Sequence, residues 1–134
     1  VYSYEDREGV PYFSKIQSIS TVNDDATQGS AASALSFSVD YNYLISSNAG
    51  DNSVILYNVN KEDGTLTKNF CLPISGEFPK DADIFPNNKF LVSLNHESCT
   101  LTFFKIDVKH GVMTMNGAPM KLTAPNSIIF HKLS

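Results

Sequence analysis

The residues best suited to chemistry are five polar side chains in the middle of the chain: Asn48, Lys80, Asp81, Asn95 and His96. Charged and amide groups contact polar ligands in pockets, and an imidazole can act as a general base near neutral pH. Each candidate also has a structural interpretation. The asparagines can cap turns, Lys80 can pair with Asp81, and His96 can be an exposed loop residue. The catalytic residues are unknown from the sequence.

Other reactive residue types lack the spacing that their chemistry requires. Cys71 and Cys99 form no CxxC or Cys/His motif, which disfavours a zinc site and indicates reduced thiols of a cytosolic protein. No phosphate-binding glycine loop, nucleophile elbow or calcium loop occurs. Three aspartates fall in turns without paired-carboxylate spacing: Asp40, Asp51 and Asp63. The histidines His110 and His131 are expected to be solvated. No cofactor and no metal are expected.

Composition limits the partners. The 134 residues are 42% hydrophobic, and 10 basic against 14 acidic residues give a net charge of −4. Without a Lys/Arg cluster, a nucleic-acid surface is not expected. Apolar stretches such as 54–57 are too short to span a membrane. The chain begins Val1-Tyr2-Ser3-Tyr4 without a signal peptide or initiator Met, so we expect a cytoplasmic protein and a piece of a longer one.

An internal repeat positions the candidate residues. Residues 37–67 align with residues 84–114 at an offset of 47 without a gap. The identical pairs are Leu44 and Leu91, Ser46 and Ser93, Asn48 and Asn95, Gly64 and Gly111, and Thr67 and Thr114. Apolar positions recur in step, with polar ones between them. A repeat of this period is typical of propellers and other repetitive folds.

Each repeat unit is predicted to contain four antiparallel strands. The predicted strands are 34–37, 43–47, 53–59 and 65–72 in the first unit, and 82–85, 89–94, 99–107 and 112–118 in the second. Their tyrosines and phenylalanines alternate with polar residues and are expected in the core. Four strands per 40–50 residues is the pattern of a β-propeller blade, so the predicted fold class is all-β.

The ends of the chain are interpreted as parts of neighbouring blades. Residues 1–4 and 12–22 are expected to be outer strands of a preceding blade, joined by a turn at 5–10. Residues 125–130 are expected to be the innermost strand of a following blade, and residues 25–34 a loop. The whole chain is then one propeller segment divided at 1–31, 32–78, 79–123 and 124–134.

Several motifs resemble the seven-bladed propeller lactonase family, which includes 6-phosphogluconolactonases and carboxymuconate lactonizing enzymes (cyclases). In the first unit they are 40–48, 50–59 and 63–66, with 15–21 before it. In the second unit they are 76–81, 86–91, Asn95, 103–107 and Gly111, and 124–130 is similar to that family's C-terminus. The resemblance implies the C-terminal blades of a seven-bladed ring around a polar pocket.

The resemblance also implies where the catalytic groups belong. That family uses a His, a Glu and two Arg residues for proton transfer and for binding negative charge. Its His, Glu and one Arg fall in blades before Val1, and Ala49 stands where the other Arg is expected. The Arg that follows its Gly-x-x-Pro motif is Lys80 here, which keeps the charge and loses bidentate geometry.

Three functions are compatible with these residues. The first is a segment of an enzyme acting on a sugar-acid or muconate-type lactone, inactive as the 134-residue chain alone. The second is a non-catalytic propeller that binds a small molecule or a protein, and the third is a scaffold fragment. Because an incomplete ring exposes apolar faces and strand edges, we expect self-association or pairing with an N-terminal portion of the parent chain.

Overall fold

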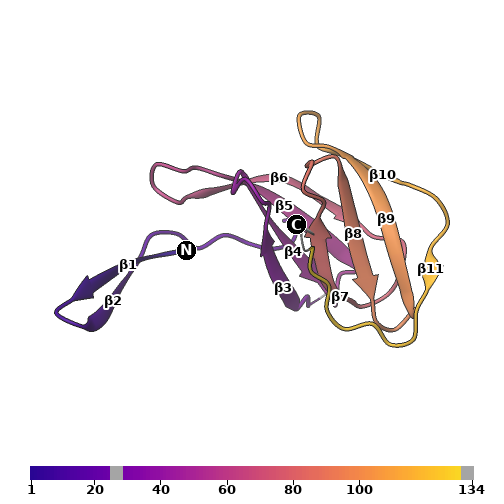
Figure 1. Ribbon diagram of the computed structural model, residues 1–134, viewed down its shortest axis with the longest axis horizontal. Helices are drawn as coiled ribbons and strands as arrows, with labels where there is room; N and C mark the ends of the chain where they lie inside the picture. The colour runs from indigo at the N-terminus through magenta and orange to yellow at the C-terminus, as the bar shows by residue number, and fades with distance from the viewer. Residues whose placement is uncertain (25–28, 131–134) are drawn as a thin grey trace, which may run out of the picture.

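The computed structural model describes residues 1–24 and 29–130, and these residues form eleven β-strands and no helix (Figure 1). The predicted all-β fold class is therefore confirmed. With no helix, this part of the chain contains none that could cross a membrane. Residues 25–28 of the predicted loop and His131 in the C-terminal tail lie outside the described residues.

The first repeat unit folds into one antiparallel sheet of four strands in chain order. These are β3 (Ala32–Phe37), β4 (Tyr43–Asn48), β5 (Ser53–Val59) and β6 (Leu66–Pro73). Gly64 has a φ of 74° in the turn between β5 and β6, a left-handed conformation that glycine adopts without the steric cost of a Cβ. The sequence predicted this hairpin from that glycine and the flanking apolar residues.

The second unit repeats the arrangement with an interrupted last strand. It contains β7 (Pro79–Ile84), β8 (Phe90–Asn95), β9 (Thr100–Asp107), β10 (Val112–Met115) and β11 (Met120–Lys121). Both β10 and β11 pair with β9, so the continuous strand predicted at 112–118 is wrong. Gly117 has a φ of 92° and Pro119 has no backbone N–H, and together they explain the break.

The 47-residue offset recurs in details of the backbone. β3 has a bulge between Ala32 and Ala34, and β7 has one at the equivalent place between Pro79 and Asp81. Left-handed residues also recur in pairs: Tyr41 and Asn88, Asn52 and Cys99, and Gly64 and Gly111. The repeat in the sequence therefore encodes turn and bulge geometry as well as the strands.

The main core lies between the two sheets, where β3 and β4 pack against β7. Its buried residues come from alternate positions of the strands, as expected for sheet faces in contact. They are Ile45, Val54, Leu56, Phe70, Ile74, Ala82, Ile84, Leu91, Phe104 and Ile106. Sheets stacked in this way are neighbouring blades of a propeller.

The N-terminal hairpin projects from this body (Figure 1). It pairs β1 (Tyr2–Arg7) with β2 (Val10–Lys15), and all of its residues are exposed. The outer strand predicted at 12–22 ends at Lys15, because the residues after it bond to the first unit through side chains instead of a ladder. The Gln17 amide, for example, accepts from the N–H of Leu66 at 2.8 Å and donates to its carbonyl at 2.9 Å.

The aromatic residues fall into three groups by burial, and the half-buried group contains Tyr43, Phe85, Phe90, Phe103 and Phe130. Tyr57, Phe70 and Phe104 are buried as predicted. The expectation of a core position is wrong for a second group with at least 38% exposure: Tyr2, Tyr4, Tyr12, Phe13, Phe37, Tyr41 and Phe78. They lie on the hairpin, on β3 and in turns, where no second sheet covers them.

Candidate functional site

Lys80 and Asp81 lie near the start of β7, and His96 lies immediately after β8. The bulge in β7 falls at Lys80, and bulges re-aim the side chains around them. The backbone N–H of His96 bonds to the carbonyl of Phe78 at 3.0 Å, which closes the loop beside the bulge. The structure therefore brings three of the five sequence candidates to one end of the second sheet.

These three side chains bond to one extended segment near the C-terminus. The Lys80 ammonium donates to Asn126 Oδ1 at 2.9 Å, and Asp81 Oδ2 accepts from the Ile128 N–H at 2.9 Å. His96 Nδ1 lies 3.0 Å from the Pro125 carbonyl oxygen. Because a carbonyl only accepts, Nδ1 carries the proton in this contact.

The strand predicted at 125–130 is wrong, because these residues join no sheet in the described structure. They run beside β7 as an extended segment that is held by side chains. Phe130 also packs on Phe85, with 4.4 Å between the ring centroids. Two of these residues cannot donate to a ladder, because Pro125 has no backbone N–H and the N–H of Ile128 bonds to the Asp81 side chain.

Asn48 and Asn95 occupy equivalent positions at the ends of β4 and β8, and both side chains are fully buried. Asn48 Nδ2 donates to the Thr21 carbonyl at 2.6 Å and to Ser53 Oγ at 3.0 Å. Each asparagine thus ties its own sheet to the chain that leads into it. Their contact with a substrate stays a prediction.

Asn95 makes the denser set of bonds. Its Nδ2 donates to Thr100 Oγ1 at 3.1 Å and Thr102 Oγ1 at 3.0 Å, and its Oδ1 accepts from Ser93 Oγ at 2.7 Å. The backbone of Gly76 lies against this amide so closely that a Cβ there would overlap Asn95 Nδ2. The close approach of Gly76 to Asn95 was not predicted from the sequence. The position of Gly76 in the Gly-x-x-Pro motif could have indicated that a glycine is required there.

A polar contact also joins the two sheets at their first strands. Ser36 Oγ on β3 donates to Asp83 Oδ1 on β7 at 2.7 Å, and Asp83 is only 8% exposed. Sequence analysis did not select this pair. The 47-residue offset could have indicated the pair, because Ser36 and Asp83 occupy equivalent positions of the two units.

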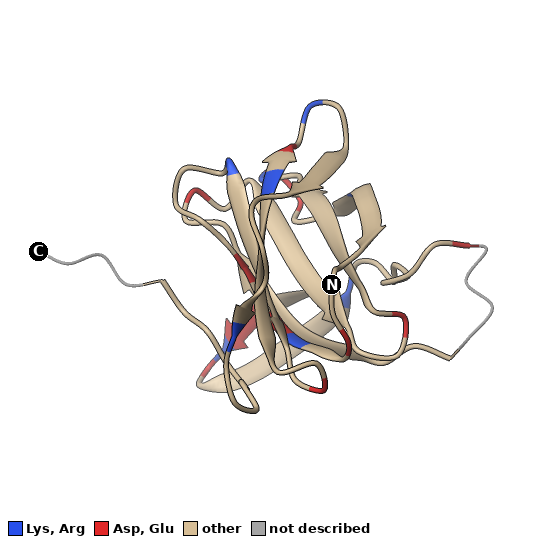
Figure 2. Ribbon diagram, turned by 90° about the vertical axis from the view of Figure 1, so that its right-hand side faces the viewer, with Lys and Arg blue, Asp and Glu red and all other residues tan. Residues whose placement is uncertain are grey.

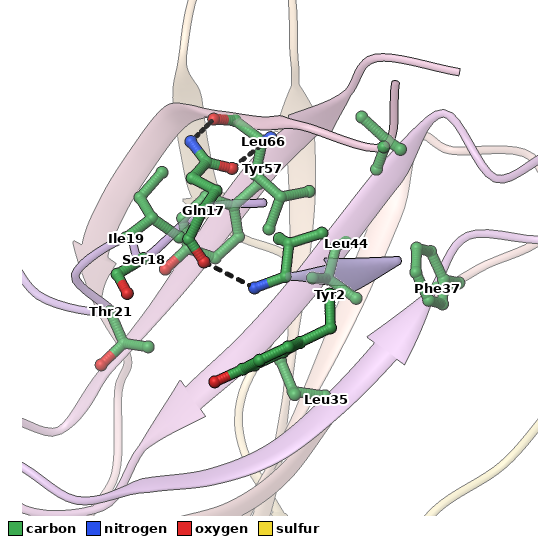
Figure 3. Close-up of a pocket in the computed structure, with 13 residues that line it drawn as sticks. Tyr2, Gln17, Ser18, Ile19, Thr21, Leu35, Phe37, Leu44, Tyr57 and Leu66 are labelled. Carbon is green, nitrogen blue, oxygen red and sulfur yellow. Dashed lines mark hydrogen bonds between the residues drawn. The ribbon is translucent and has the colours of Figure 1, made fainter. Parts of the chain in front are cut away.

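A cavity with a volume of about 670 Å³ lies on the face of the first sheet that is turned away from the main core. Figure 3 shows apolar side chains of β3, β4 and β6, Tyr57, and the Gln17 amide bonded to Leu66. Leu35 and Phe37 are 68% and 51% exposed on its β3 side. The lining is mostly apolar and contains none of the five sequence candidates. We therefore interpret this cavity as part of a sheet face that no second sheet covers.

The remaining reactive groups are placed without a catalytic arrangement. Cys71 and Cys99 are free, and burial raises the pKa of the Cys71 thiol, which disfavours the reactive thiolate. Among the described residues, no group of three His, Cys, Asp or Glu side chains could hold a metal ion. His110 is exposed and bonds to Asp107 in its own turn at 2.8 Å. Charged residues of both signs are scattered along the ribbon in Figure 2.

Comparison with known proteins finds two relatives that are named 6-phosphogluconolactonase. A 6-phosphogluconolactonase of Bacillus subtilis (strain 168) is 29% identical over 118 residues, which are 88% of this chain and 34% of that protein. A 6-phosphogluconolactonase of Formosa agariphila is 34% identical over 76 residues, or 55% of this chain and 22% of that protein. The chain spans about a third of the length of the Bacillus relative.

Solved structures share the fold. The periplasmic gluconolactonase of Pseudomonas aeruginosa superposes with a TM-score of 0.80 at 20% identity, covering 94% of this chain and 35% of that one. A protein from Lactobacillus plantarum gives a TM-score of 0.77 at 24% identity, covering 92% and 36%. Residues 1–130 match the family described as lactonase, 7-bladed beta-propeller. With two stacked sheets, of four and five strands, at the predicted period, the chain belongs to this family of seven-bladed propeller lactonases.

Proposed function

We propose that this chain is the C-terminal part of a lactonase that, when complete, hydrolyses a sugar-acid lactone. In that reaction water adds to the acyl carbon, the ring C–O bond breaks, and a hydroxy acid forms. The family match over residues 1–130 carries the proposal. The name 6-phosphogluconolactonase, which belongs to the Bacillus relative, supports a phosphorylated sugar lactone as the substrate class. A muconate-type lactone is the second proposed class.

Lys80 is the candidate for contact with the anionic part of such a substrate. Its ammonium has three N–H donors, and the described structure uses one of them for Asn126. The other two can bind carboxylate or phosphate oxygens as a point charge. The proposal gives Lys80 a role in substrate binding and none in bond cleavage.

The 134-residue chain is proposed to be inactive alone. Ala49, only 5% exposed, stands where the resemblance implies an arginine, and its backbone N–H bonds to the Ala31 carbonyl at 2.8 Å. Loss of one donor to a developing oxyanion costs on the order of 10²–10³ in rate. The apolar cavity and the exposed hairpin support pairing with another copy or with the remaining blades of the parent chain. The two free cysteines support a cytoplasmic location.

A non-catalytic binding propeller is the second candidate function, and Ala49 is the observation that favours it. An alanine has no group to stabilise the oxyanion that develops during hydrolysis, and binding without turnover does not require one. In this case the complete protein would bind a lactone or carboxylate without turning it over.

The test compares the 134-residue chain with the protein encoded by the complete parent reading frame. Hydrolysis of 6-phosphogluconolactone and of a muconate-type lactone is followed by acid release, with calorimetric binding of the hydroxy acid measured in parallel. We expect turnover by the complete protein and none by the chain alone. Binding without turnover by the complete protein would support the second candidate, and turnover by the isolated chain would contradict the proposal. Light scattering on the chain reports whether it self-associates.

A further inference from the structure

The side chains of Lys80, Asp81 and His96 do more than occupy one end of the second sheet. All three bond to the stretch 125–128, which has no ladder hydrogen bonds in the described structure. Two of the three bonds go to backbone atoms, so they hold the path of the chain and do not depend on the side chains of the segment. These bonds take the place of the missing ladder.

The repeat shows that this arrangement is particular to one junction. At the offset of 47, the equivalents of the three residues in the first unit are Ser33, Ala34 and Ala49. The junction between the two sheets therefore has none of the three groups at the equivalent positions. It uses strand packing and different polar contacts, which are the bond from Ser36 to Asp83, the bond from Asn88 to Asp40 and the bond from the Phe78 N–H to Asn52. A general requirement of blade packing would place the same groups at both junctions.

The bond to Ile128 has a clear physical basis. A partly buried backbone N–H costs free energy when it has no partner, and bonds to a charged acceptor are the stronger ones. The Asp81 carboxylate meets this N–H with one oxygen, while its other oxygen accepts from the N–H of Ala82 at 2.9 Å. The Asp81 end of the contact is thus fixed, because Ala82 is in β7 and buried in the core.

We propose that Lys80, Asp81 and His96 form a clamp that positions residues 125–128 against β7. Asp81 and His96 are positioning residues in this clamp, and their polar atoms are used on the chain itself. The clamp also holds Asn126 against the Lys80 ammonium and so fixes the direction of that charge. The inference does not depend on lactonase activity, because it concerns contacts within this chain.

Amide hydrogen exchange, measured by NMR on the 134-residue chain, tests the clamp at single residues. Asp81→Ala should speed exchange of the Ile128 amide at least about tenfold, the change expected when a charge-assisted hydrogen bond is lost. The amide of Ile55, at the centre of the first sheet, should keep its protection and serves as the internal control for folding. Exchange at Ile128 within twofold of the unmodified chain would overturn the proposal, and so would equal acceleration at both amides.

Conservative variants separate positioning from general packing. His96→Asn can place an amide N–H near the position of Nδ1, so it should retain protection of Ile128 that His96→Ala loses. Glu97→Ala is the matched control, since it removes a neighbouring carboxylate that is not part of the clamp. If Glu97→Ala loosens Ile128 as much as Asp81→Ala, or if His96→Asn gives no rescue, the clamp is refuted.

Discussion

Gly76→Ala tests whether the close approach of the chain to Asn95 is required. A Cβ at this position would overlap Asn95 Nδ2 and would lie 2.5 Å from its Cγ and 2.8 Å from its Cβ. The Asn95 side chain is fully buried and held by several hydrogen bonds, so it has no free space into which it can turn. We therefore expect the substitution to destabilise the fold.

The magnitude follows from two contributions. Overpacking a dense core costs about 1–3 kcal/mol, and displacing a buried amide from its partners costs about 1–3 kcal/mol more. The sum has a central value of about 4 kcal/mol, which corresponds to a fall in Tm of about 14 °C for a domain of this size. Gly29→Ala is the matched control, because a Cβ there meets no atom within 4 Å, and it should change stability by less than about 0.5 kcal/mol.

Urea and thermal unfolding of the two variants provide the measurement. Asn95→Ala and the double substitution Gly76→Ala with Asn95→Ala complete a double-mutant cycle. The double substitution removes two of the three close contacts, so its cost should fall well short of the sum of the single substitutions. If Gly76→Ala unfolds within 2 °C of the unmodified chain, or if the two substitutions are additive, the close approach is not the reason for glycine here.

Three further predictions concern contacts between segments distant in the sequence. Tyr57→Phe removes a bond of 2.8 Å to the Ser20 carbonyl and should cost about 1–3 kcal/mol in urea unfolding. Burial, with a smaller effect of Cys71, raises the pKa of Tyr57 to about 12. Because the unfolded chain ionises first, stability should fall between about pH 10 and 12, and a profile identical in Tyr57→Phe would contradict this. Asp40→Ala should lower Tm. Burial acts to raise the pKa of Asp40, but four hydrogen bonds from Ser38, Asn42 and Asn88 outweigh it, so the pKa of Asp40 is lowered. The stability that Asp40 contributes is present above about pH 4 and lost as pH falls through the lowered pKa, so an unchanged acid unfolding midpoint in Asp40→Ala would refute it. Ser36→Ala and Asp83→Ala should show a coupling of at least about 0.5 kcal/mol in a double-mutant cycle, and strict additivity would show that their bond joins the sheets without stabilising them.

The sequence was sufficient to predict the repeat and most strand positions. Both rest on local physics: alternate residues of a strand face opposite sides, and left-handed turns recur where Gly64 and Gly111 permit them. The predicted strand 53–59 agrees with β5, and the other complete strands differ by a few residues at their ends. The equivalence of Asn48 and Asn95 followed from the offset alone, since equal spacing places them at the same point of two similar sheets.

The tertiary structure decided which polar groups meet. The partners of Asp81 and His96 lie 47 and 29 residues further along the chain, and nothing local in the sequence links them. The same is true of Gln17, whose amide bonds to a strand edge 49 residues away. The segments 16–22 and 125–130 read as strands because their residues favour extended backbone. Whether an extended segment joins a ladder depends on a free strand edge beside it, and only the packing of the sheets determines where such edges are.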